Sequence, residues 1–204
     1  MSLLKQLGDK SWERKGIIGG LRPVGAFDTA PEKVALVFFL VVATVVFSLF
    51  TVGYFLRMEL PDWAPLEDPA KLWLNTGLLV ISSALFQWAR NIASNNESRN
   101  IKTAFIGGGV FALLFIAGQL STWNDLNSAG YYIASNPSAS FFYLLTGVHG
   151  LHLLGGLWVW SKSSIKLLSG AEPKEVRLSI QLCTLYWHFL LIVWVVLFAI
   201  LSNT

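Results

Sequence analysis

The sequence has 204 residues, of which 54% are hydrophobic and 13% charged, and its formal net charge is +3. Soluble domains usually carry about 25% charged residues, so this composition excludes an ordinary soluble domain and favours a membrane protein. Five apolar runs are each long enough to cross a bilayer core of about 30 Å as a helix. They cover roughly residues 34–56, 72–89, 103–121, 139–161 and 178–201. The sequence therefore predicts an all-α membrane protein, a bundle of five transmembrane helices.

Residues 1–33 precede the first predicted span and mix apolar residues with charges. Such a segment either forms a short helix on the membrane surface or stays a loosely ordered tail, and both interpretations are open. The first long apolar run begins near residue 34, which is too late and too long for a cleaved signal peptide. We therefore expect two parts, an N-terminal tail over 1–33 and a transmembrane domain over 34–204.

Lys and Arg are distributed unevenly among the segments that connect the spans. Thirteen of the fifteen lie in the N-terminal segment and in the second and fourth connections, and only Arg57 and Lys71 lie in the first. Cytoplasmic loops of membrane proteins carry an excess of Lys and Arg. The N-terminus is therefore expected in the cytoplasm, and the C-terminus on the opposite, periplasmic or outer side.

The three histidines are the only ionisable side chains deep within the predicted spans. His149 and His152 stand three positions apart in TGVHGLHLLGG, so they share one helix face, and His188 in the last span could face them. This pattern is compatible with a three-histidine copper or zinc site, or with a bis-histidine haem. A ligating imidazole normally donates its other N–H to a carboxylate, carbonyl or water. No carboxylate lies at that depth, and the single cysteine, Cys183, excludes a dithiolate site.

A structural role for the histidines needs fewer partners. A neutral imidazole can form a hydrogen bond across a helix interface, and Thr146, Tyr186 and Ser140 are candidate partners. Gly147 and Gly150 would let a neighbouring helix come close. We therefore interpret the histidines as structural and expect no catalytic, cofactor-binding or metal-binding residue in this chain. The missing carboxylates also disfavour a proton pump or an ion-coupled transporter.

Two stretches are similar to the signature motifs of a known family. TGVHGLHLLGG (146–156) and YWHFLLIVWVVLFAIL (186–201) resemble subunit III of haem–copper cytochrome c oxidases. The second span, LNTGLLVISSALFQWA (74–89), resembles the LNT…SS pattern of that family. GQLSTWNDL (118–126) stands where the family has a glutamine and an aromatic residue. The resemblance covers about residues 34–201, with Tyr54 and Arg57 closing the first span.

The resemblance implies the short bacterial form of this subunit, with five helices, in the bacterial inner (cell) membrane. In that family, subunit III holds no haem or copper, and both are expected in partner subunits. The implied role is accessory: the chain would contact mainly subunit I and also subunit II, bind membrane phospholipid in a cleft between helices, and support proton uptake during oxygen reduction. The matching positions, which become candidate structural or lipid-cleft residues, are Arg57, Asn75, Thr76, Gln119, Thr146, His149, Gly150, His152, Gly155, Tyr186, Trp187, His188 and Trp194.

Three positions depart from the family pattern. The family usually has a glutamate in the first of these helices, where this sequence has Val42, Ala43 or Thr44. It often has an aspartate after YWHF, where Leu191 stands, and a glutamate near the end of the third span, where Thr122 stands. All three differences remove an acid. The roles of the family's buried glutamate, including its lipid contacts, are therefore not carried over to this chain.

Two alternatives stay open. The related accessory subunit of nitric oxide reductases shares the same helix pattern, and the lost carboxylates favour it. A haem-bearing membrane anchor would use His152 and His188 as axial ligands. A transporter is disfavoured, because no buried charge or broken helix marks a binding site at the bilayer midplane.

Overall fold

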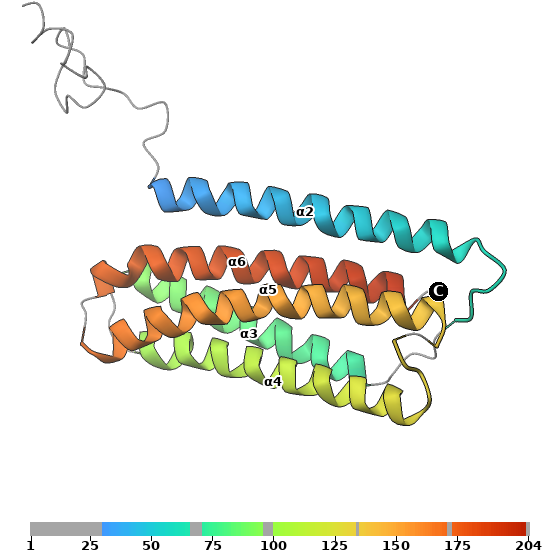
Figure 1. Ribbon diagram of the computed structural model, residues 1–204. Coiled ribbons are helices and arrows are strands. Elements are labelled where there is room, and N and C mark those ends of the chain that lie inside the picture. Colours follow the sequence, from blue (N-terminus) through green and yellow to red (C-terminus); the bar gives the residue numbers. More distant parts are fainter. Residues whose placement is uncertain (1–29, 66–70, 96–99, 134, 171–172, 203–204) are drawn as a thin grey trace, which may run out of the picture. The chain divides into compact units, whose positions relative to one another are not determined.

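The computed structural model describes residues 30–65, 71–95, 100–133, 135–170 and 173–202. These residues contain no strand and five helices (Figure 1), namely α2 (Pro31–Met58), α3 (Lys71–Ser94), α4 (Ile101–Ser128), α5 (Pro137–Leu168) and α6 (Pro173–Leu201). Each is long and apolar enough to cross a membrane, which confirms the predicted five-helix membrane protein. The chain divides into two units, 1–35 and 36–204, and the packing described below is that of the second. The predicted surface helix in the tail lies outside the described residues.

The helices extend past the predicted apolar runs. α4 continues to Ser128 and α5 to Leu168, each about two turns beyond the predicted end. Hydropathy identifies only the part of a helix that lies inside the bilayer core. The hydrogen-bonded helical backbone continues until a residue ends it. Gly130 and Gly170 end the two helices with φ angles of 89° and 90°, a conformation that glycine adopts without steric cost.

Helices α3 to α6 form a four-helix bundle in which α3 and α5 each pack against both α4 and α6. Large aromatic side chains fill its interior, and the fully buried ones are Trp187, Trp194, Phe86, Phe105, Phe115 and Phe142. Their rings meet edge to face across helices, with centroids 5.5 Å apart for Phe86 and Phe105 and 4.8 Å for Phe115 and Trp194. Such pairs contribute about 0.5–1.5 kcal/mol beyond the burial of their area. Interlocking rings thus set the spacing of the bundle.

Helix α2 is attached to the bundle by side chains, with few close contacts between backbones. Only 11% of its apolar span is buried, against 33–44% for the other four helices. Two of its aromatic side chains, Phe47 and Tyr54, join a small buried cluster with Leu145 of α5 and with Val193 and Leu197 of α6. The attachment leaves room between α2 and α6 for the groove described below.

Gly109 lets the indole ring of Trp160 lie against α4. A Cβ atom at Gly109 would come within 2.0 Å of Trp160 Cε2, and the indole N–H donates to the carbonyl of Phe105 at 2.9 Å. We expect Gly109→Ala to destabilise the chain by about 1–3 kcal/mol, the usual cost of overpacking, and to lower its unfolding midpoint in detergent. Gly155→Ala is the matched control, because a Cβ there would meet nothing within 4 Å. Equal midpoints for the two variants would contradict the close packing.

Candidate functional site

His149 lies inside the four-helix bundle and is completely buried. Its Nε2–H donates to the backbone carbonyl of Leu190 on α6 at 3.1 Å. A carbonyl oxygen only accepts, so this bond selects the tautomer with hydrogen on Nε2. The ring also packs against Phe115 and Trp194, with centroid distances of 5.8 and 5.1 Å. His149 therefore joins α5 to α4 and α6 from inside the bundle.

His152 is half-buried and faces α2. Its Nδ1–H donates to the carbonyl of Val148 at 2.8 Å, one turn back on the same helix. The ring contacts Phe39 and Phe47 of α2, with centroid distances of 5.9 and 5.2 Å. Ala43 lies between these two phenylalanines on the same helix face and is 3% exposed. His152 is thus a main contact between α5 and α2.

His188 is half-buried on α6 and faces α3. The hydroxyl of Ser83 donates to its Nδ1 at 2.5 Å, and its Nε2–H donates to Gln87 Oε1 at 2.9 Å. Because the amide oxygen of Gln87 only accepts, the hydrogen of this imidazole is on Nε2. Both ring nitrogens are therefore used in bonds to α3.

The three imidazoles face three different neighbours, namely α6, α2 and α3. The spacing of His149 and His152 does not bring them to one site, and the expectation that His188 could face them is wrong. Among the described residues, no group of three or more His, Cys, Asp or Glu side chains could hold a metal ion.

The hydroxyl groups predicted to bond the imidazoles bond elsewhere. Thr146 Oγ1 accepts from the indole N–H of Trp123 at 3.1 Å, and Ser140 donates to a carbonyl in the preceding loop. The Tyr186 hydroxyl donates to the backbone carbonyl of His152 at 2.9 Å, not to its ring. The prediction of these partners was wrong because the rings bond to backbone carbonyls and to α3, which side-chain periodicity does not reveal.

The remaining polar motif residues gather inside the bundle. Asn75 Nδ2 of α3 donates to Gln119 Oε1 of α4 at 3.4 Å, and both side chains are buried. The indole N–H of Trp194 donates to Thr76 Oγ1 at 3.0 Å, joining α6 to α3. Trp187 is fully buried in the same core. These motif residues therefore pair helices with one another.

Gly150 and Gly155 do not mark close helix contacts, since a Cβ atom at either position would meet nothing within 4 Å. The prediction that Gly150 lets a neighbouring helix approach is wrong. Gly156 has that role, because a Cβ there would come within 2.7 Å of both Trp187 and Tyr186. The sequence alone does not show which glycine of this run of small residues faces the core and which ones face outward.

Arg57 closes α2 and pairs with Asp62 in the following loop. Its Nη1–H donates to Asp62 Oδ1 at 2.6 Å, and its Nη2–H donates to Oδ2. The hydrogen bond from Arg57 is the main cause that lowers the pKa of the Asp62 carboxyl. Both side chains are substantially exposed, so the pair orders the turn after α2 and adds little to stability.

At each of the three positions where the resembled family has an acid, this chain has a neutral side chain, so no charge there needs a partner. The Thr44 hydroxyl donates to the carbonyl of Leu40 at 2.8 Å, and the Thr122 hydroxyl donates to that of Gly118 at 3.0 Å. Each bond reaches one turn back on the same helix, as Ser and Thr side chains commonly do. Leu191 is partly buried and packs against the main core.

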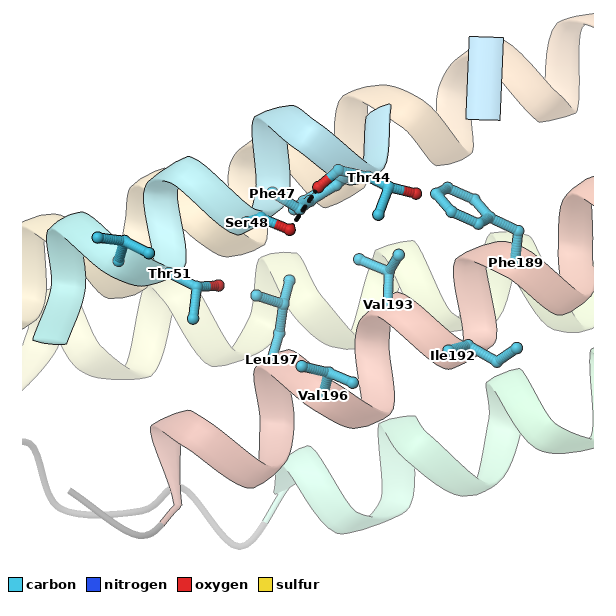
Figure 2. A pocket seen from close by; sticks show the side chains of 10 residues that line it. Thr44, Phe47, Ser48, Thr51, Phe189, Ile192, Val193, Val196 and Leu197 are labelled. Carbon is cyan, nitrogen blue, oxygen red and sulfur yellow. Dashed lines mark hydrogen bonds between the residues drawn. The ribbon is translucent and has the colours of Figure 1, made fainter. Parts of the chain in front are cut away.

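A groove with a volume of about 560 Å³ lies between α2 and α6. Figure 2 shows its α6 wall, which is apolar, and its α2 wall, which carries the hydroxyls of Thr44, Ser48 and Thr51. The Ser48 hydroxyl donates to the carbonyl of Thr44 at 2.8 Å. The complete lining is Thr44, Phe47, Ser48, Thr51, Val52, Phe189, Ile192, Val193, Val196 and Leu197. The groove is therefore uncharged and mostly apolar.

The sequence reasoning did not single out Ser48 and Thr51. Together with Thr44 they stand at positions i, i+4 and i+7 of an otherwise apolar span, a spacing that places side chains on one helix face. This signal could have indicated a hydroxyl stripe on α2. It could not have indicated which helix the stripe faces.

The chain is similar to known proteins over almost all of the described residues. The family model "Cytochrome c oxidase subunit III" matches residues 32–202. Cytochrome c oxidase subunit 3 of Synechocystis is 30% identical over 80% of this chain and 71% of its own length. Probable cytochrome c oxidase subunit 3 of Mycobacterium bovis is 32% identical over 69% of this chain and 70% of its own. Cytochrome c oxidase subunit 3 of Thermostichus vulcanus is 25% identical over 81% of this chain and 84% of its own length.

Replacing the histidines tests whether they are structural. We expect His149→Leu to cost about 1 kcal/mol, because interhelical hydrogen bonds in membranes contribute about 0.6 and at most about 1.7 kcal/mol. The unfolding midpoint should fall slightly, while the haem and metal content of the purified protein should not change. His152→Leu and His188→Leu serve as parallel variants. Loss of a haem or a metal ion with any one of the three would contradict the structural interpretation.

Proposed function

Because the chain belongs to the cytochrome c oxidase subunit III family, we propose that it is a redox-silent, lipid-binding companion of the catalytic subunits of a haem–copper terminal oxidase. The chain is an accessory subunit of such an oxidase and associates with its other subunits. The observation that carries this conclusion is the family match over residues 32–202, which reaches from the first turn of α2 to the end of α6.

The proposal places haem and copper in the partner subunits and none in this chain. Its support is the arrangement of the imidazoles, each of which bonds to a backbone carbonyl or to side chains of α3. A bis-histidine haem on His152 and His188 would require one ring to leave its contacts with α2 and the other to leave its bonds to α3. The haem-anchor alternative therefore fits the chain poorly.

The groove between α2 and α6 supports the lipid part of the proposal. An acyl chain needs an apolar surface without unsatisfied donors, and the α6 wall offers Val193, Val196 and Leu197. On the α2 wall, Thr44 and Ser48 donate their hydroxyl hydrogens to carbonyls of their own helix. They therefore present no free donor to a lipid chain. The proposed ligand is an acyl chain of a membrane phospholipid.

The proposal also includes the location and orientation of the chain. It is a multi-pass membrane protein, and we place it in the bacterial inner membrane with its N-terminus in the cytoplasm. The uneven distribution of Lys and Arg supports this orientation. In the complex, subunit I would be its main contact and subunit II a further partner. Its contribution would be to stabilise subunit I and to support proton uptake during oxygen reduction.

Purification in mild detergent tests the proposed function. We expect an affinity-tagged form of this chain to recover a haem–copper catalytic subunit with oxidase absorption bands, while the chain separated from its partners should show no Soret band. Recovery of nitric oxide reductase subunits in place of oxidase subunits would overturn the oxidase assignment. A stoichiometric Soret band in the isolated chain would overturn its redox-silent character.

A bulky side chain in the groove tests the lipid site. We expect Val196→Trp to fill part of the groove and to remove about one phospholipid per complex, as measured by mass spectrometry of the purified oxidase, because an indole would occupy volume needed by an acyl chain. Oxidase turnover should fall in parallel if the lipid supports it.

Val159→Trp is the matched control for this variant. Val159 lies on α5, away from the groove lining, and is 51% exposed, compared with 50% for Val196. The two substitutions therefore add the same bulk at similar exposure. Equal lipid content in both variants and in the wild type would refute the groove as the lipid site.

A further inference from the structure

The groove between α2 and α6 lies in only one half of the membrane span. The middle of the predicted apolar run of α2 is at Val45, and that of α6 is next to Phe189. On α2 the groove lining runs from Thr44 to Val52. On α6 it runs from Phe189 to Leu197. On both helices the groove therefore begins at the middle of the span and extends toward the C-terminal end.

The length of the groove matches the depth of one leaflet. Thr44 and Val52 differ by eight positions, which corresponds to about 12 Å along the helix axis. Phe189 and Leu197 have the same separation in the sequence. A bilayer core of about 30 Å gives each leaflet about 15 Å. The groove thus extends from the midplane through most of one leaflet and does not enter the other.

Aromatic rings close the groove at the middle of the span. The ring of Phe189 lies beside Thr44 at one end of the groove (Figure 2). Nearer the N-terminal ends of the two helices, Phe39 of α2 contacts Tyr186 of α6, with ring centroids 6.0 Å apart. Phe39 also contacts the ring of His152 at 5.9 Å. Aromatic side chains therefore fill the space between α2 and α6 on that side of the groove.

The other end of the groove continues into exposed apolar surface. Val52 and Val196 are exposed, and Phe55 and Leu56 extend the exposed apolar surface of α2 toward its C-terminal end. These side chains carry no polar atoms, so contact with an acyl chain removes apolar surface without leaving a donor or an acceptor unpaired. The groove is therefore closed at the midplane and open toward the C-terminal ends of α2 and α6.

We propose that the acyl chain in this groove belongs to a phospholipid of the leaflet at the C-terminal ends of α2 and α6, which is the periplasmic leaflet in the proposed orientation. The terminal methyl group of the chain lies beside Thr44 and Phe189, and its carbonyl end lies near Val52 and Leu197. A chain from the opposite leaflet would have to displace the aromatic rings at the midplane. The inference rests on the proposed function, since the ligand is the proposed phospholipid, and it adds the leaflet that supplies it.

A matched pair of tryptophan substitutions on α2 tests the leaflet. Val52→Trp narrows the open end of the groove, and Val41→Trp places the same ring beyond its closed end. Val41 and Ser48 are one heptad apart and share a face of α2, and the exposed fractions of Val41 and Val52 are 56% and 55%. The two variants therefore differ mainly in the leaflet that receives the added ring. The readout is the phospholipid content per complex, measured by mass spectrometry of the oxidase purified through the tagged chain.

We expect Val52→Trp to remove about one phospholipid per complex, because an indole occupies volume that the acyl chain needs, and Val41→Trp to keep the wild-type content. The reverse result, or equal loss in both variants, would overturn the assigned leaflet and leave the lipid-binding function standing. Wild-type lipid content in both variants and in Val196→Trp would overturn the leaflet and the lipid site together. Recovery of a haem–copper subunit with the wild-type chain tests the accessory role separately.

A measurement on the unaltered complex gives the direction of the acyl chain without any substitution. Phosphatidylethanolamine with a photoreactive diazirine near the acyl carbonyl, or near the terminal methyl group, is exchanged into the purified oxidase and activated by light. Mass spectrometry of the peptides then identifies the labelled residues. We expect the carbonyl-end probe to label Val52 or Leu197 and the methyl-end probe to label Thr44 or Phe189. The opposite order of labelling would overturn the assigned leaflet.

Discussion

Lipid offers no hydrogen-bond partner, and this constraint accounts for the position of many polar side chains in the five helices. Hydroxyls on α2 turn back to carbonyls of their own helix, as Thr44 and Ser48 do. Larger polar side chains reach a neighbouring helix, as His149 does at the Leu190 carbonyl and Trp194 at Thr76. A histidine in this chain is therefore a means of pairing helices.

The helices of this chain make two kinds of contact, which have different structural consequences. Inside the bundle, aromatic rings lie directly against glycines, as Trp160 does at Gly109 and Trp187 at Gly156. Helix α2 instead meets α5 through His152 and the aromatic rings around it. A contact made through long side chains leaves space beside it, and the groove toward α6 occupies that space. Helix α6 of the bundle thus forms one wall of the groove, and helix α2 forms the other.

The sequence predicts the parts of this structure that depend on composition. Five spans follow from hydropathy, and the family follows from the motifs around His149, His152 and His188. The helix ends cannot be predicted from hydropathy, because glycines such as Gly170 end the helices beyond the apolar runs. The imidazole partners do not follow either, since helix periodicity gives the face of a residue and not the neighbour opposite. Gly155 and Gly156 are adjacent and identical in the sequence, yet only the second faces the core.

Under the proposed function, the missing acids limit the ways in which this bundle can support proton uptake. Thr44 and Thr122 bond to carbonyls one turn back, and Leu191 packs against the core, so none of the three positions requires a counter-charge. The apolar spans of this sequence contain no carboxylate at all at mid-depth. A relay of protons through a membrane usually depends on such groups. Under the proposed function, the support that this chain gives to proton uptake must therefore pass through packing against its partner and through the lipid in the groove.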